Sequence, residues 1–294
     1  MDRIDQTTHP TNSDLDSLQP PLRLDRRGFV KTSLGAGFAA AVLPVQAKTM
    51  INTDTQGLTA GEIRIPTKDG EMPAYRAQPA GKIGLATVLV VQEIFGVHEY
   101  IKDVCRRLAK LGYLAVAPEL YARQGDVSKM SVPDILANVV AKIPDAQVMT
   151  DLDAAAAWAA THGGGAKLGI TGFCWGGRIV WMYAAHNPAL AAGVAWYGNV
   201  ATGRFPGDKG AVQVVDRIKA PILGLYGGAD SGIPNDTVEK MRAALKASGN
   251  VRSEIVLYPD TPHAFHADYR DSYRKRPAED GWKRLTAWFG QYLA

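Results

Sequence analysis

Apolar runs alternate with amphipathic stretches along the chain from Ile51 onward. Leu85–Val91 (LATVLVV) is short, apolar throughout and rich in β-branched residues, which predicts a buried strand. Asp145–Thr161 is rich in alanine and is followed by glycines, which predicts a helix. By the same criteria we predict further strands at 113–117, 167–171, 192–197, 221–226 and 253–258, and further helices at 97–111, 178–185, 237–247 and 280–293.

This alternation of strands and helices predicts the fold class. It is typical of an α/β protein in which helices cover both faces of a mostly parallel sheet. No low-complexity linker or internal repeat interrupts residues 61–294, so we expect a single domain there, preceded by a linker over 48–60. The chemistry of such sheets lies at the carboxyl ends of the strands, and each strand-to-loop junction therefore bears on function.

The first 47 residues have a different pattern. A polar stretch leads to the pair Arg26-Arg27, an apolar run follows over Leu34–Val45, and the sequence Val45-Gln46-Ala47 resembles a small-residue cleavage site. This pattern predicts a twin-arginine-type signal peptide over 1–47, and hence a periplasmic or secreted protein; the alternative is a disordered basic tail. The apolar run is too short to span a bilayer, so we expect no stable membrane anchor.

Composition and charge exclude several classes of protein. The 294 residues are 46% hydrophobic and carry a formal net charge of only +4, without a stripe of lysine and arginine interleaved with aromatics. A nucleic-acid partner is therefore unsupported. The two cysteines are too few for a disulfide framework, no zinc-type cluster occurs, and no pattern specifies an oligomeric state.

Cys174 lies in the motif GFCWGG, between a predicted strand and a predicted helix. The motif is the nucleophile pattern G-x-S-x-G with cysteine in place of serine. Its glycines would let the strand and helix approach the turn, and the helix N-terminus would favour a thiolate. We predict that Cys174 is a nucleophile and that the NH of Trp175 forms half of an oxyanion hole. The alternative is a buried structural cysteine, which is what we expect of Cys105 in the middle of a helix.

An acid and a base follow in the order that an α/β hydrolase requires. Asp230 lies in a glycine-rich loop after the strand at 221–226, where a carboxylate could orient an imidazole. Asp236 is a second candidate acid, although its position also suits a helix N-cap. His263 follows the last predicted strand and is the candidate general base, with His266 as its rival.

Glu93 follows the strand Leu85–Val91 in the segment QEIFGV. A carboxylate at the end of a buried strand needs a partner, because burying an unpaired charge is costly. A salt bridge or a helix cap would supply one. We also consider the hypothesis that Glu93 points at the thiol of Cys174, with the NH of Ile94 completing the oxyanion hole.

Five segments together resemble the dienelactone hydrolase family (carboxymethylenebutenolidases): QEIFGV, GYLAVAPELYAR, GFCWGG, GGAD and PHAF. The resemblance covers nearly all of the chain after roughly Gly61. It implies an α/β-hydrolase fold with Cys174 as nucleophile, His263 as base and Asp230 as its orienting acid. It also implies that Glu93 is a mobile carboxylate that keeps the thiol protonated at rest and helps to activate it when substrate binds.

The chain departs from the family in its arginines. Members of the family bind a substrate carboxylate with arginines, one of them shortly after the catalytic histidine, whereas the segment AFHADYR after His263 has none at the matching place. Arg123, or a cluster formed by Arg270, Arg274, Lys275 and Arg276, could contact an anion or could form a solvated basic surface. Further candidate substrate contacts are Tyr121, Phe265 and His266.

The sequence therefore predicts hydrolysis of a small-molecule ester or lactone through a thioester on Cys174, without a metal or organic cofactor. One alternative is an esterase or thioesterase for a neutral substrate. The others are an α/β-hydrolase-fold protein that binds a ligand without catalysis, and a protein whose thiol responds to redox conditions.

Overall fold

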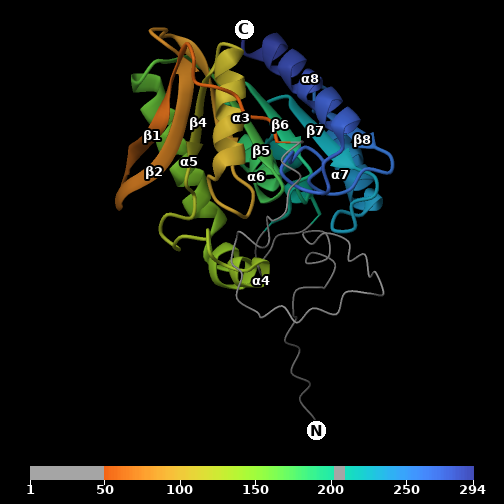
Figure 1. Cartoon of the computed structure of the whole chain (residues 1–294). Coiled ribbons are helices and arrows are strands. Elements are labelled where there is room, and N and C mark those ends of the chain that lie inside the picture. Colours follow the sequence, from red (N-terminus) through yellow and green to blue (C-terminus); the bar gives the residue numbers. More distant parts are fainter. Residues whose placement is uncertain (1–49, 202–208) are drawn as a thin grey trace.

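The computed structural model describes residues 50–201 and 209–294, which form an eight-stranded sheet in the order β1-β2-β4-β3-β5-β6-β7-β8 (Figure 1). β1 pairs with β2, and β2 with β4, in antiparallel fashion, and all the other pairs are parallel. The strands are β1 Leu58–Thr67, β2 Gly70–Pro79, β3 Leu85–Val91, β4 Leu114–Pro118, β5 Gly164–Phe173, β6 Ala192–Trp196, β7 Ile222–Gly227 and β8 Glu254–Tyr258.

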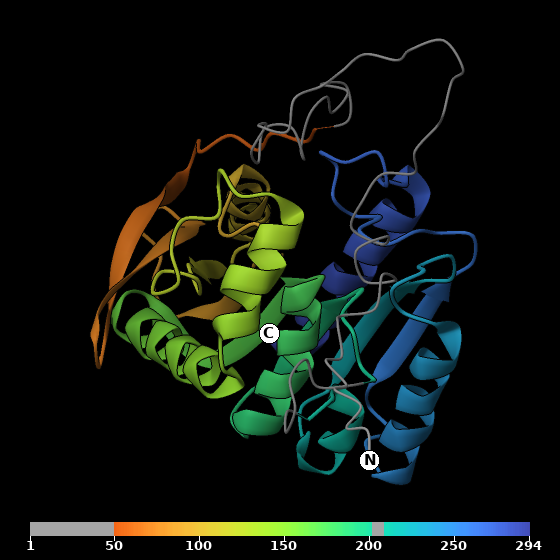
Figure 2. The ribbon, with the colours of Figure 1, turned by 90° about the horizontal axis from the view of Figure 1, so that it is seen from below.

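Helices cover both faces of the sheet, as Figure 2 shows from below: α3 and α8 lie on one face, and α5, α6 and α7 on the other. The helices are α3 Glu99–Lys110, α4 Val132–Asp134, α5 Asp145–Thr161, α6 Trp175–His186, α7 Asn235–Ala247 and α8 Lys275–Tyr292. Short helical turns are η1 Ile135–Val139, η2 Val140–Lys142, η3 Ala211–Gln213 and η4 Val215–Arg217. The predicted α/β class with a mostly parallel, doubly covered sheet is confirmed.

The sequence pattern located the parallel strands and the longer helices well. β3 and α5 have the predicted bounds, and the other predicted elements occur with their ends shifted. Two of the three glycines after α5 belong to β5, so that strand begins at Gly164 and not at residue 167. The hairpin of β1 and β2, and the turns after α4, were not predicted.

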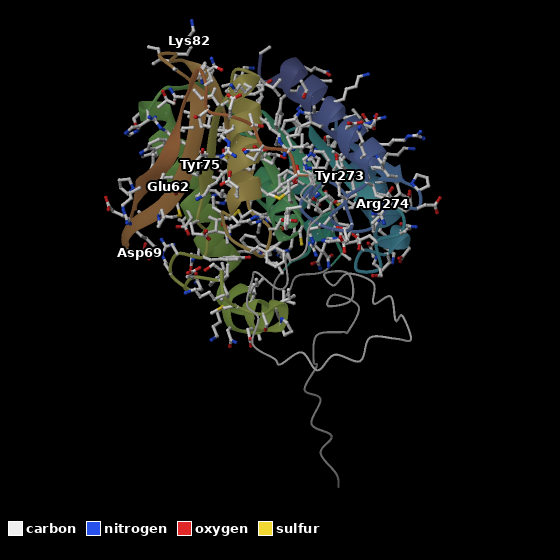
Figure 3. All side chains as sticks on the ribbon, in the orientation of Figure 1. Glu62, Asp69, Tyr75, Lys82, Tyr273 and Arg274 are labelled. Atoms are coloured by element: carbon white, nitrogen blue, oxygen red, sulfur yellow. The ribbon has the colours of Figure 1, made fainter. Side chains whose placement is uncertain are left out.

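The hairpin extends the sheet at the N-terminal side of the domain. Figure 3 labels Asp69 at the tip of the hairpin and Tyr75 on β2, where the Tyr75 hydroxyl accepts a hydrogen bond from Arg106 of α3. β1 begins at Leu58, before the expected domain boundary at residue 61, and Thr53 hydrogen-bonds to Asp103 and Arg106 of α3. Part of the segment expected as a linker therefore packs on the domain. The predicted signal peptide lies outside the described residues.

The strand order reverses between β3 and β5. The chain moves from β3 to β4 on one side and continues from β5 toward β8 on the other, which is where α/β sheets form their binding crevice. Val91 lies opposite Gly172 in the pairing of these two strands. Glu93 and Cys174, each two residues further along, therefore leave the sheet from adjacent strands at its carboxyl edge.

Candidate active site

Cys174 occupies a strained turn between β5 and α6. Its φ is 57° and its ψ is −116°, a conformation that non-glycine residues rarely adopt. Its NH donates to the carbonyl of Trp196 at 3.0 Å, and its carbonyl accepts from the NH of Gly177 at 2.9 Å. The thiol is partly exposed and forms no disulfide. This geometry presents Cys174 at the N-terminus of α6, where the helix dipole favours negative charge.

The glycines of GFCWGG are required by close contacts around this turn. A Cβ on Gly172 would collide with the carbonyl of Gly176, and a Cβ on Gly176 would lie 2.5 Å from the carbonyl oxygens of Val91 and Gln92. A Cβ on Gly177 would collide with the carbonyl of Trp196. The absence of side chains at these three positions lets α6 begin directly against the ends of β3 and β6.

His263 and Asp230 meet across the loops that follow β8 and β7. Nδ1 of His263 lies 2.6 Å from Oδ2 of Asp230, and the other carboxylate oxygen accepts from the NH of Gly232 at 2.9 Å. The loops are joined by backbone hydrogen bonds, from Gly228 to Tyr258 at 2.7 Å and from Ala229 to Thr261 at 3.0 Å. The backbone thus fixes the acid beside the imidazole.

The charges around His263 favour its protonated form. Burial lowers its pKa, but the negative charges of Asp230 and of a Cys174 thiolate outweigh burial and raise the pKa to about 10. Nε2 of His263 makes no hydrogen bond among the described residues. Tyr197, which also has a positive φ, packs its ring edge-on against the imidazole at 5.1 Å between centroids. The arrangement suits an imidazolium beside Cys174.

Two backbone NH groups remain available next to Cys174. Within the described residues, neither the NH of Ile94 nor that of Trp175 donates a hydrogen bond. Ile94 follows β3, and Trp175 is the first residue of α6, so both lie at the edge from which Cys174 emerges. Such donors can stabilise an oxyanion.

Glu93 is fully buried and is held by aromatic and cationic side chains. Its Oε2 accepts a hydrogen bond from the Tyr269 hydroxyl at 2.6 Å and lies 3.6 Å from Nε2 of His98. Burial acts to raise the pKa of Glu93, but the nearby His98 and the charge of Arg270 hold that pKa below its ordinary value. Burial raises the pKa of Tyr269, so Tyr269 remains a donor. Oε1 of Glu93 has no hydrogen bond among the described residues.

Arg270 separates from the basic cluster in which the sequence placed it. Arg274, Lys275 and Arg276 are exposed on the surface, whereas the guanidinium of Arg270 packs over the Phe95 ring at 5.6 Å. Burial acts to lower the pKa of Arg270, but the electrostatic influence of the neighbouring Tyr269, Glu93 and Cys174 raises it. Arg270 therefore places a positive charge next to the candidate nucleophile.

The structure corrects several expected substrate contacts. Phe265 and His266 are core residues: Phe265 packs on Trp196, Tyr197 and Tyr258, and Nδ1 of His266 lies 2.6 Å from the Tyr100 hydroxyl. His266 therefore does not replace His263 beside Asp230.

Arg123 pairs with carboxylates of the β1–β2 hairpin and of α5. Its guanidinium pairs with Asp69 of the hairpin turn and Asp151 of α5, each at 2.7 Å, and lines a cavity of about 640 Å³ between these elements. Tyr121 is buried and packs on Trp175, the residue after Cys174, with 5.2 Å between ring centroids.

The remaining candidates have structural positions. Asp236 lies in the first turn of α7, not at its N-cap, and pairs with Lys240 on the surface at 2.8 Å. Cys105 is buried in α3 as expected. In the described ranges, no three His, Cys, Asp or Glu side chains form a group that could hold a metal, and no helix is long and apolar enough to cross a membrane.

Sequence reasoning assigned no role in the site to Tyr269 or His98. His98 is the N-cap of α3, and its ring also packs edge-on against that of Tyr269, with 5.0 Å between the ring centroids. Neither residue lies in a recognisable sequence motif. The only available signal was the need of a buried Glu93 for a partner.

Comparison with known proteins agrees with this fold and identifies a family. Residues 72–293 match the model of the dienelactone hydrolase family. A protein of Methylorubrum extorquens named "Putative carboxymethylenebutenolidase" is 60% identical over 290 residues, which cover 96% of this chain and 98% of that protein. A protein of the same name from Salmonella typhimurium is 53% identical over 265 residues, which cover 89% of this chain and 97% of that protein.

A solved structure supports the same assignment. The crystal structure titled "Putative Dienelactone Hydrolase", from Klebsiella pneumoniae, is 56% identical to this chain and superposes with a TM-score of 0.77. The similarity covers 80% of this chain and 99% of that one. The chain therefore belongs to the dienelactone hydrolase family, has the α/β-hydrolase fold and is a carboxylic ester hydrolase.

Proposed function

We propose that this enzyme cleaves an ester or lactone by nucleophilic catalysis through Cys174, His263 and Asp230. The observation that carries the proposal is the placement of Cys174 on a strained turn at the N-terminus of α6, with His263 held by Asp230 at 2.6 Å. A nucleophile, a base and an acid that orients the base are the elements of a catalytic triad.

In the first half of the reaction, the Cys174 thiolate attacks the carbonyl carbon and the carbonyl oxygen becomes an oxyanion. The NH groups of Ile94 and Trp175 hold that oxyanion, which typically contributes about 10²–10³-fold to the rate for each donor. The tetrahedral intermediate collapses, the bond to the leaving oxygen breaks, and that oxygen takes the proton from Nε2 of His263. The acyl group is then a thioester of Cys174.

In the second half, neutral His263 removes a proton from water, whose oxygen attacks the thioester. The bond between carbon and sulfur breaks, the carboxylic acid leaves, and the thiolate and imidazolium are restored. The raised pKa of His263 supports the imidazolium of this pair. The cycle uses only groups of the chain and water.

Glu93 is proposed as the carboxylate that controls the thiol. Its position just after β3, the strand adjacent to β5, and its buried Oε1 with no described hydrogen bond support a role as a proton acceptor. The test is Glu93→Gln, measured by the alkylation rate of Cys174 and by turnover. If neither changes, Glu93 has no such role.

Arg270 supports an anionic lactone as substrate. It supplies a partly buried positive charge near Cys174 although the arginine expected shortly after His263 is absent from its usual place. A neutral ester is the second candidate, because Glu93 already lies close enough to offset the charge of Arg270.

The deciding experiment compares hydrolysis of a dienelactone with that of p-nitrophenyl acetate, by the chain and by Cys174→Ala. Turnover of the lactone that Cys174→Ala abolishes would support the triad and an anionic substrate. Turnover of the simple ester alone would support a neutral substrate. Activity that survives Cys174→Ala would overturn the mechanism, and rapid formation of a sulfenic acid on Cys174 without acylation would favour a redox role.

We also propose that the protein is exported through its pair Arg26-Arg27. The test is cell fractionation of the chain and of the double variant Arg26→Lys, Arg27→Lys. A wild-type chain found in the cytosol would contradict export.

A further inference from the structure

We propose that Glu119 is a positioning residue that holds the loop of residues 92–97 so that the NH of Ile94 faces the carbonyl oxygen of the substrate. Glu119 follows β4, and none of the roles assigned above uses it. The inference rests on the proposed function, because it concerns the oxyanion hole of that reaction.

The carboxylate of Glu119 joins the loops that follow β3 and β4. Its Oε2 accepts from the NH of Val97 at 2.8 Å, and its Oε1 accepts from the NH of Tyr121 at 3.3 Å. In the opposite direction, Oε1 of Gln92 accepts from the NH of Leu120 at 3.3 Å. Each loop thus accepts a backbone hydrogen bond from the other.

The loop is shaped to fit this carboxylate. Gly96 has a φ of +74°, and a Cβ there would lie 3.0 Å from Oε2 of Glu119 and 3.4 Å from Oε1. The turn at Gly96 therefore wraps around the carboxylate, and the positive φ that permits it is one that glycine adopts without strain.

On its other side, the same loop packs against the turn that carries Cys174. The carbonyl oxygens of Val91 and Gln92 approach Gly176 so closely that a Cβ there would lie 2.5 Å from each. Residues 92–97 are therefore fixed between α6 and Glu119, and Ile94 lies in the middle of this fixed segment. Displacement of an oxyanion donor by a fraction of an ångström weakens its contact with the transition state.

Glu119 itself is held mainly by backbone donors. Burial raises its pKa, and the hydrogen bonds from Val97 and Tyr121, with the Gln92 amide, act against that effect. A partly buried carboxylate without a close ion pair is costly, and the hydrogen bonds that it accepts from loop NH groups offset that cost.

The test separates chemistry that needs an oxyanion hole from chemistry that does not. Hydrolysis forms an oxyanion, whereas alkylation of Cys174 by iodoacetamide displaces iodide and forms none; Cys105 is buried and does not compete. For Glu119→Ala we expect kcat for p-nitrophenyl acetate to fall roughly 100-fold with KM and the alkylation rate little changed. Glu119→Gln keeps one acceptor oxygen for Val97, and we expect it to restore most of kcat. Glu71→Gln, on the exposed surface, is the control.

Gly96→Ala tests the same contact from the loop side, and we expect the same separation of kcat from alkylation. An unchanged kcat in Glu119→Ala would overturn the proposal. So would a parallel loss of turnover and alkylation in both Glu119→Gln and Gly96→Ala, which would indicate a general structural role. If Cys174→Ala remains active, the proposed function itself fails, and that result is distinct from either outcome at Glu119.

Discussion

The hydroxyl of Tyr269 donates a hydrogen bond of 2.6 Å to Oε2 of Glu93, and both side chains are buried. Tyr269 follows β8 and Glu93 follows β3, so this contact joins two distant parts of the active-site edge. It fixes the orientation of a carboxylate that would otherwise be free to turn.

We expect Tyr269→Phe to lower kcat/KM by roughly 10-fold, because Glu93 loses the donor that orients it. The measurement is steady-state hydrolysis of p-nitrophenyl acetate together with the alkylation rate of Cys174. Tyr273→Phe, in the segment that precedes α8 and labelled in Figure 3, removes a hydroxyl outside the site and should have no effect. Equal effects of the two substitutions would argue against a specific role for Tyr269.

Asp230→Asn should lower the pKa of His263 from about 10 toward its ordinary value of 6.5, because the charge of Asp230 contributes to raising it. Titration of the imidazole by NMR measures this shift. A pKa above 6.5 means that protonation of His263 stabilises the fold fully below about pH 6.5 and that the contribution is lost as the pH rises toward 10. The free energy of unfolding should therefore fall over this range in the wild type and fall less in Asp230→Asn. Identical pH profiles would contradict the coupling.

Arg270→Gln should raise KM for an anionic lactone by roughly 10–100-fold, because a charge-assisted hydrogen bond contributes about 1.5–3 kcal/mol. KM for p-nitrophenyl acetate should stay the same. Arg274→Gln removes an exposed arginine four residues away and serves as the control. A similar change in KM for both substrates would exclude recognition of an anion by Arg270.

Gly176→Ala should destabilise the chain by roughly 1–3 kcal/mol and reduce turnover, because its Cβ would meet the carbonyl oxygens of Val91 and Gln92 at 2.5 Å. For Gly290→Ala, in α8, the added Cβ would have no other atom within 4 Å, and the substitution should stabilise the chain by about 0.5–1 kcal/mol. Urea denaturation of both variants gives the comparison. Equal stabilities would show that the turn before α6 adjusts without cost.

The sequence pattern did not predict the strands that are only partly buried. β1 and β2 were missed because a hairpin at the edge of a sheet has one exposed face, and its residues mix apolar and polar types without a continuous apolar run. The parallel strands are buried on both faces, and their apolar runs identified them.

The sequence by itself determined the parallel sheet, the motif around Cys174 and the order of Cys174, Asp230 and His263 along the chain. These follow from local pattern: apolar runs, glycines at a tight turn and polar residues after strand ends. Only the tertiary structure decided that His263 and not His266 meets Asp230, that Arg123 pairs with Asp69 and Asp151, and that Arg270 leaves its basic cluster to face Glu93. The physical reason is that a partner for a charged or polar side chain comes from whichever segment the strand order places beside it, and for Glu93 that segment lies 176 residues away at Tyr269.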